Sequence, residues 1–216
     1  MVDSYKILYK GGSGELVEKK SRFIADLRPV ASEEEALEYI EEIRKKYWDA
    51  RHHCFAYIIG DRGQSARCSD DGEPSQTAGK PMMDVLAGEE LHDVCAVVTR
   101  YFGGTLLGTG GLVRAYSGAV KEGIKNCVIL EKKLAVRLNI TTDYSGVGKI
   151  QYIAAQGGID TLDIRYTDKA VFTFLVPIAE ERRFTAQITE GTAGKAVIQR
   201  VDEVYYGLGD SGLVVF

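Results

Sequence analysis

The segment from Arg100 to Tyr116 constrains the fold of this chain more than any other part of the sequence. Five glycines lie within it, between an apolar run at Val94–Thr99 and an amphipathic pattern that begins near Thr109. The short apolar run predicts a strand buried on both faces. The pattern that follows places Leu112, Tyr116 and Val120 on one side of a helix. The sequence therefore predicts a strand, a tight glycine-rich turn and a helix.

This turn has two interpretations. Glycines let backbone N–H groups converge at a helix N-terminus, where the helix dipole favours an anion such as a phosphate, with Arg100 or Arg114 as the charged partner. The segment matches neither the Walker loop nor the dinucleotide fingerprint, since both need residues that are absent here. The other interpretation is a close-packed turn in which glycine supplies positive φ angles.

Length, charge and cysteine usage indicate an ordinary water-soluble protein of two domains. The 216 residues suffice for two domains, which we expect at 1–132 and 133–216. Residues 1–132 carry 18 basic and 21 acidic side chains and the rest carry 9 and 10, so neither half is a basic nucleic-acid module. No apolar run is long enough to cross a membrane, and no signal peptide is evident. We therefore expect a cytoplasmic protein that does not bind membranes. The four cysteines form no Cys-x-x-Cys pair, and Cys54 and Cys95 lie within apolar runs, so we expect neither a zinc site nor a disulfide framework.

The first domain shows strand-like segments near 15–17 and 23–27, followed by a helix whose start is well marked. Ser32 and Glu35 form a capping box, and basic residues at 44–46 suit the helix C-terminus. A buried strand follows at Cys54–Ile59. From Gly60 to about Lys80 we expect a polar loop, and a loop of that length usually has a function.

The second domain has the pattern strand, helix, strand, strand, helix, strand. Alternating apolar residues mark strands near 134–140 and 162–166, and a turn at 167–169 leads into 171–176. Helices are expected near 144–156 and 180–189, and a last strand at 196–206. This β-α-β-β-α-β order predicts a ferredoxin-like domain, and the chain as a whole is expected to be α+β.

Three polar clusters in the first domain could carry chemistry: Lys20–Ile24 with Arg22 before a strand, Ala50–Cys54 with two histidines, and the acidic segment Ser69–Pro81. His52 and His53 are adjacent, so in a strand they point to opposite faces and do not readily chelate one metal ion. The acidic loop contains Asp70, Asp71 and Glu73, whose carboxylates could bind Mg²⁺ or act as acid and base. The same residues are also ordinary turn formers. No nucleophile elbow is present.

Several of these motifs together resemble the IMPACT family, in its two-domain bacterial form. The resemblance rests on Lys20–Phe23, Ala50–Cys54, Ser69–Pro74 with Thr77–Pro81, and Arg100–Gly104 with Leu107–Tyr116. It implies a first domain like the second domain of small-subunit ribosomal protein five, and a ferredoxin-like second domain similar to the fifth domain of elongation factor G. It also implies translational regulation, as in eukaryotic members. One departure is Gln76, where a small residue is expected.

The leading functional hypothesis is a non-enzymatic cytoplasmic regulator associated with translation, which binds RNA, the ribosome or a translation-associated protein. The resemblance supplies no catalytic residues, and we expect neither a cofactor nor a metal ion. The expected groove residues are Arg22, His52, Lys80, Arg100, Gly103, Gly104, Gly108, Gly110, Gly111 and Arg114. The alternative is an enzyme that holds a phosphorylated small molecule at the glycine turn and uses the acidic loop. A pure protein-interaction module is a third possibility.

Overall fold

The computed structural model describes residues 1–209 and 212–216. Contacts between residues divide the chain into two compact units, one made of Val2 and Ser4–Glu131 and the other of Met1, Asp3 and Lys132–Phe216. We call them the N-terminal unit and the C-terminal unit. Both combine helices with a sheet, which confirms the predicted α+β class.

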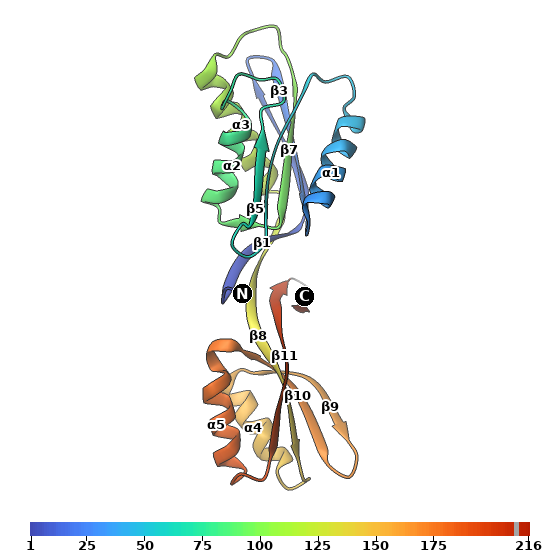
Figure 1. Ribbon diagram of the computed structural model, residues 1–216, viewed down its shortest axis with the longest axis vertical. Helices are drawn as coiled ribbons and strands as arrows, with labels where there is room; N and C mark the ends of the chain where they lie inside the picture. Colours follow the sequence, from blue (N-terminus) through green and yellow to red (C-terminus); the bar gives the residue numbers. More distant parts are fainter. Residues whose placement is uncertain (210–211) are drawn as a thin grey trace. The chain divides into compact units, whose positions relative to one another are not determined.

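A five-stranded antiparallel sheet is the centre of the N-terminal unit, with strand order β2-β3-β7-β4-β5. Helix α1 covers one face of this sheet, and helices α2 and α3 cover the other (Figure 1). A short parallel pair, β1 with β6, adds to this unit. The elements in chain order are β1 (Ser4–Lys10), β2 (Gly12–Glu18), β3 (Ser21–Pro29), α1 (Glu33–Lys46), β4 (His52–Ile59), β5 (Ser65–Ser69), α2 (Gly79–Gly88), β6 (Leu91–His92), β7 (Val94–Tyr101) and α3 (Thr109–Ile124).

Each face of this sheet has its own core, because strand side chains alternate between faces. On β3, Phe23, Ala25 and Leu27 face α2 and α3, and so do Cys54, Ala56 and Ile58 on β4. Phe55, Tyr57 and Ile59 on β4 pack instead against α1. Strand β7 contributes to both cores and is buried almost throughout, as its apolar run predicted.

The predicted start of α1 is confirmed. The Glu35 backbone N–H donates to Ser32 Oγ at 3.3 Å, and the Glu35 carboxylate accepts from the Ala31 backbone N–H at 2.8 Å. Three acidic residues in the first turn and three basic residues in the last turn complement the helix dipole.

The expectation of one polar loop from Gly60 to about Lys80 is wrong. Strand β5 forms at Ser65–Ser69 and pairs with β4, and α2 begins at Gly79. Strand β5 is an edge strand whose side chains are half-buried or exposed, so it carries no hydrophobic alternation. Helix α2 was missed because its first residues, Gly79, Lys80 and Pro81, are typical of loops.

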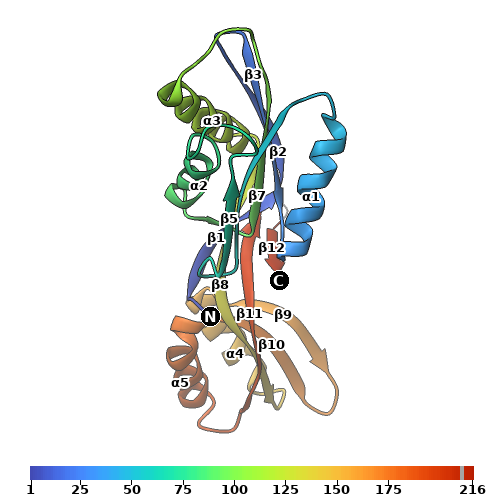
Figure 2. The same ribbon diagram turned by 45° about the horizontal axis from the view of Figure 1, so that its top comes forward.

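The C-terminal unit has the predicted β-α-β-β-α-β order, with β8 (Val128–Thr142) entering it from the N-terminal unit. Its antiparallel sheet has the order β11-β8-β10-β9, and α4 and α5 pack on one face of this sheet (Figure 2). This is the ferredoxin-like strand order, with an additional strand, β12, paired to β11. The remaining elements are α4 (Val147–Gly157), β9 (Asp160–Tyr166), β10 (Ala170–Pro177), a 3-10 turn η1 (Ile178–Glu180), α5 (Glu181–Gly191), β11 (Val197–Gly209) and β12 (Gly212–Val215).

Candidate functional site

Asp70 organises the loop between β5 and α2. Its carboxylate accepts backbone N–H groups from Gln76 at 2.8 Å, Ala78 at 2.9 Å and Gly79 at 2.8 Å. Burial acts to raise the pKa of Asp70, but these N–H donors outweigh it and hold the pKa below its ordinary value. Asp70 therefore supplies the N-terminal cap that α2 lacks locally.

Asp71 joins this loop to α1 and β4. It accepts from Arg44 of α1 at 3.2 Å and from the His53 backbone N–H at 2.7 Å. The His52 ring nitrogen Nδ1 lies 2.9 Å from the Asp71 carbonyl oxygen. The neighbouring His53 ring is buried on the α1 side, with Nε2 3.1 Å from the Tyr47 carbonyl. As predicted, the two histidines face opposite sides of β4.

Glu73 forms a buried ion pair with Arg100 of β7. The Arg100 Nη1 to Glu73 Oε1 distance is 2.6 Å, and the two side chains are only 8% and 4% exposed. The same carboxylate oxygen accepts from the Tyr116 hydroxyl of α3 at 2.8 Å. Burial is the main cause that raises the pKa of Tyr116, which keeps the hydroxyl protonated as the donor. Glu73 thus connects the acidic loop, the sheet and α3.

Arg100 is also enclosed by aromatic rings. Its guanidinium carbon lies 5.4 Å from the ring centre of Phe23 and 5.6 Å from that of Phe102. At these distances each ring attracts the cation. The Arg100 Nε–H is buried and has no hydrogen-bond acceptor among the described residues. Arg100 is therefore a neutralised, internal cation and not a free anion-binding group.

Beside Arg100 is a cavity of about 390 Å³ at the end of β4 and β7, which we call the Phe102 cavity. Phe102 is 57% exposed and Leu106 is 83% exposed, although both are apolar. The Tyr101 hydroxyl donates to Asp49 at 2.7 Å, which fixes one rim. The lining residues are Asp49, Ala50, Arg51, His52, Arg100, Tyr101, Phe102 and Leu106.

The first glycine pair brings the turn against the neighbouring hairpin. A Cβ atom on Gly103 would lie 2.1 Å from the Lys20 carbonyl carbon, and the Gly103 N–H donates to Ser21 Oγ at 3.0 Å. Only glycine permits this approach. Gly104 has open space around it but a φ of +84°, which also favours glycine.

The second group of glycines begins α3. Gly108 has a φ of +73° and precedes the helix, and no side chain caps it; Gly110 and Gly111 lie in the first turn. Arg114 is on the next turn and exposed, it has no ion pair among the residues that the structure describes, and its guanidinium is 3.7 Å from where a Cβ on Gly110 would be. The helix start and Arg114 are thus together, as the anion-binding hypothesis requires.

Of the predicted groove residues, only His52 and Arg100 line the Phe102 cavity. Arg22 pairs in register with Tyr101 and points to the α1 side of the sheet, opposite to Phe23 and Arg100. There it binds Glu15 at 2.9 Å, and its guanidinium carbon lies 5.8 Å from the ring centre of Tyr101, a lining residue of the cavity. Lys80 is on the exposed side of α2, where it forms an ion pair with Asp84. The residues expected to form one groove are therefore divided among the Phe102 cavity, the Gly103–Gly104 turn, the α3 start, Arg22 beside Tyr101, and Lys80 on α2.

Sequence reasoning missed Phe102, Arg51 and Tyr116 as site residues. Phe102 was detectable as an aromatic residue between a buried strand and a glycine pair. Tyr116 was assigned to the helix core, and its hydroxyl contact to Glu73 spans 43 residues of sequence. Gln76 has a φ of +63°, in the left-handed region that favours glycine and is uncommon for other residues.

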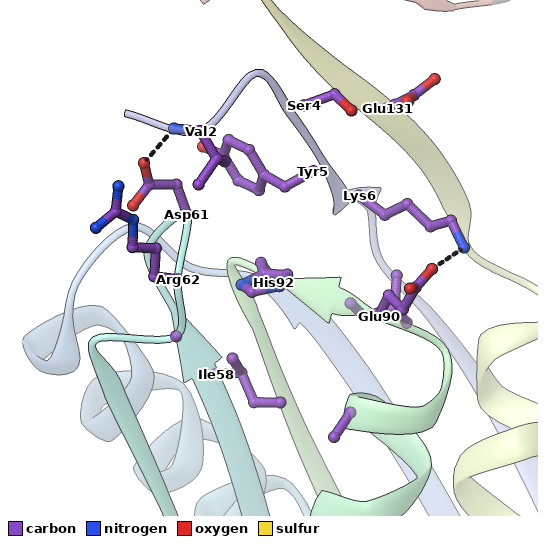
Figure 3. Close-up of a pocket in the computed structure, with 13 residues that line it drawn as sticks. Val2, Ser4, Tyr5, Lys6, Ile58, Asp61, Arg62, Glu90, His92 and Glu131 are labelled. Carbon is purple, nitrogen blue, oxygen red and sulfur yellow. Dashed lines mark hydrogen bonds and ion pairs between the residues drawn. The ribbon is translucent and has the colours of Figure 1, made fainter.

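A larger cavity of about 520 Å³ lies elsewhere in the N-terminal unit (Figure 3). Its polar groups largely pair with one another: Lys6 with Glu90 at 2.9 Å, and the Val2 N–H with Asp61 at 3.1 Å. None of the residues predicted from the sequence lines it. Within 1–209 and 212–216, no three His, Cys, Asp or Glu side chains are placed to hold a metal ion. No helix in those ranges is long and apolar enough to cross a membrane.

The fold and the site define a class of two-unit α+β proteins with a glycine-rich strand-to-helix turn beside an aromatic cavity. The family of the Impact N-terminal domain matches residues 19–124, and a domain of unknown function, DUF1949, matches residues 140–195. The chain belongs to the IMPACT family.

Relatives match over nearly the full length. The chain is 42% identical to the IMPACT family member YvyE of Bacillus subtilis, over 95% of this chain and 94% of that protein. It is 35% identical to the IMPACT family member YigZ of Escherichia coli, over 86% of this chain and 92% of YigZ. A crystal structure described as that of a hypothetical protein is 32% identical, with a TM-score of 0.60 over 94% of this chain and 99% of its own.

Proposed function

We propose that this protein is a non-enzymatic cytoplasmic regulator associated with translation, which binds RNA or the ribosome through the N-terminal unit. Membership of the IMPACT family supports the link to translation, since the resemblance implies that role for eukaryotic members. The binding surface we propose is the Phe102 cavity together with the turn and the α3 start. A translation-associated protein is the other partner that this surface could take.

One observation carries the proposal: this surface combines exposed aromatic and apolar groups with cations that have no internal partner. Arg51 at the cavity and Arg114 on α3 are exposed and form no ion pair within the described residues, whereas Arg100 is neutralised by Glu73. Exposed arginines beside aromatic rings suit a nucleic-acid backbone and its bases. Because the chain has a net charge of −4, such binding must be local and sensitive to salt.

The enzymatic alternative draws less support from the geometry. The carboxylates of Asp70, Asp71 and Glu73 all accept hydrogen bonds from their own fold. In this arrangement they hold the loop in place and are not directed together at a ligand. The one feature that still favours an enzyme is the start of α3, where no side chain among the described residues caps the backbone N–H groups that could bind a phosphate. A phosphorylated metabolite with Mg²⁺ that raises the melting temperature would favour it.

Co-sedimentation with ribosomal particles across a salt series tests the proposal. We expect association at low salt that weakens steeply as salt rises, and an Arg51→Ala, Arg114→Ala double variant that binds more weakly with a flatter salt dependence. Arg182→Ala is the matched control, because Arg182 is an exposed arginine of the C-terminal unit that forms no ion pair with any residue in the described part of the chain. Absence of association at low salt would contradict the proposal. Association unchanged in the double variant would remove this surface from it.

A further inference from the structure

Phe102 is held in an unusual position for a large apolar side chain. More than half of the Phe102 side chain is exposed. Its ring centre nevertheless lies 5.6 Å from the guanidinium carbon of the buried Arg100. Arg100 is in turn fixed by Glu73 and by the ring of Phe23. The ring of Phe102 thus lies against a buried cation that the fold itself holds in place. This contact favours one position of the ring, which lowers the entropic cost of binding a ligand against it.

The surroundings of Phe102 indicate what would bind there. Arg51 lines the same cavity. Lys20 lies beside the turn, because its backbone packs against Gly103 directly after Phe102. Arg51, Lys20 and the adjacent Lys19 are exposed and form no ion pair among the described residues. Arg51 thus borders the exposed ring and Lys19 and Lys20 lie on the neighbouring β2–β3 turn, while Asp49, the one carboxylate among the described lining residues, accepts the Tyr101 hydroxyl. Cations beside an exposed ring complement a planar group attached to an anionic backbone.

The size of the Phe102 cavity limits which ligands could bind there. About 390 Å³ is at the lower end of the range of roughly 300–1,000 Å³ for small-molecule sites. Such a space suits one planar ring and not a double helix. Bases within a duplex are already stacked on each other, whereas unpaired bases of loops and single strands can stack on an aromatic side chain.

We propose that the Phe102 cavity is a subsite for one unpaired base of single-stranded RNA. The base stacks on the exposed part of Phe102, while Arg51 and Lys20 face the flanking phosphates. This inference rests on the proposed function and deepens it, since it states which form of RNA the surface selects. It makes Phe102 the residue that distinguishes single-stranded from duplex RNA.

The experiment compares the binding of a fluorescently labelled single-stranded RNA 12-mer and of a blunt duplex of the same sequence to the full-length protein. We expect wild type to prefer the single strand, and Phe102→Ala to weaken single-strand binding by about tenfold, in line with the usual contribution of base stacking. Phe102→Tyr keeps a ring and should bind like wild type, whereas Phe102→Leu keeps apolar area only and should resemble Phe102→Ala. A 2-aminopurine in the RNA should be quenched on binding to wild type and not to Phe102→Ala.

Tyr152→Ala is the matched control, because Tyr152 is 59% exposed and lies in the C-terminal unit. Thermal melting confirms that each variant is folded. If wild type binds RNA but Phe102→Ala binds the single strand as tightly as wild type does, or if Phe102→Leu binds it like wild type, the stacking subsite is overturned and the proposed function stands. If wild type binds neither RNA form nor ribosomal particles at low salt, the proposed function fails and the subsite with it.

Discussion

Among single residues, Glu73 and Arg100 matter most for the Phe102 cavity, because their buried ion pair holds Arg100 beside the Phe102 ring. Removing the Glu73 charge leaves a guanidinium that is 92% buried without a counter-ion, so we expect Glu73→Gln to lower the free energy of unfolding by about 3 kcal/mol. Urea unfolding measures this loss. Asp84→Asn is the control: its ion pair with Lys80 is more than half exposed on both sides, and such pairs contribute about 0.5 kcal/mol. Equal effects of both variants would contradict the buried role of Glu73.

Asp70 makes the stability of this loop depend on pH. Backbone N–H donors favour its charged form, so the pKa in the folded protein is below the ordinary value of about 4. The charged Asp70 carboxylate therefore contributes fully to the free energy of unfolding above about pH 4 to 5. This contribution is lost as the pH falls through the pKa of Asp70 in the folded protein. We expect the difference in unfolding free energy between wild type and Asp70→Asn to be constant near neutral pH and to shrink below about pH 4. A difference that does not change with pH would show that charge is irrelevant at this position.

The glycine turn shows, at the scale of elements, that neighbouring glycines have different reasons to be there. A Cβ on Gly103 would meet backbone atoms of Lys20 at 2.1 Å and 2.3 Å, so Gly103→Ala must displace the β2–β3 turn. We expect a loss of more than about 2 kcal/mol in unfolding free energy, as for other severe overpacking. A Cβ on Gly110 would meet only a flexible Arg114 nitrogen, at 3.7 Å. Because alanine favours the helix more than glycine does, we expect Gly110→Ala to raise the free energy of unfolding by about 0.5–1 kcal/mol. Parallel urea unfolding of the two variants distinguishes steric need from helix propensity.

The sequence predicted those helices and strands whose signals lie within the element itself, such as a capping residue or alternating apolar side chains. Helix α1 is marked by Ser32 and Glu35, and the strands of the C-terminal unit by alternating apolar residues. Helix α2 escaped prediction because its first N–H groups bond to Asp70, eight and nine residues earlier in the chain. Strand β5 escaped because an exposed edge strand needs no apolar side.

The whole molecule contains separate hydrophobic cores in its two units. Phe174 is fully buried in the C-terminal unit, between Phe172 and Phe184, and Phe23 is fully buried in the N-terminal unit. We expect calorimetry to show two unfolding transitions. Phe174→Ala should lower the unfolding free energy of the C-terminal unit and Phe23→Ala that of the N-terminal unit, each by the roughly 3–5 kcal/mol typical of a phenylalanine replaced by alanine in a core. A single transition shifted alike by both variants would show that the units unfold together.

The sequence alone determined the class of the fold, the order of elements in the C-terminal unit and the membership of the family, because these depend on periodicity and on motifs of contiguous residues. Only the tertiary structure decided how those residues combine. Glu73, Arg100 and Tyr116 meet across the fold and neutralise a cation that the sequence presented as free. Strand register separates Arg22 from Arg100, because adjacent residues on a strand face opposite sides of the sheet. Pairing over long sequence distances leaves no local pattern, and this is why the Phe102 cavity could not be read from the sequence.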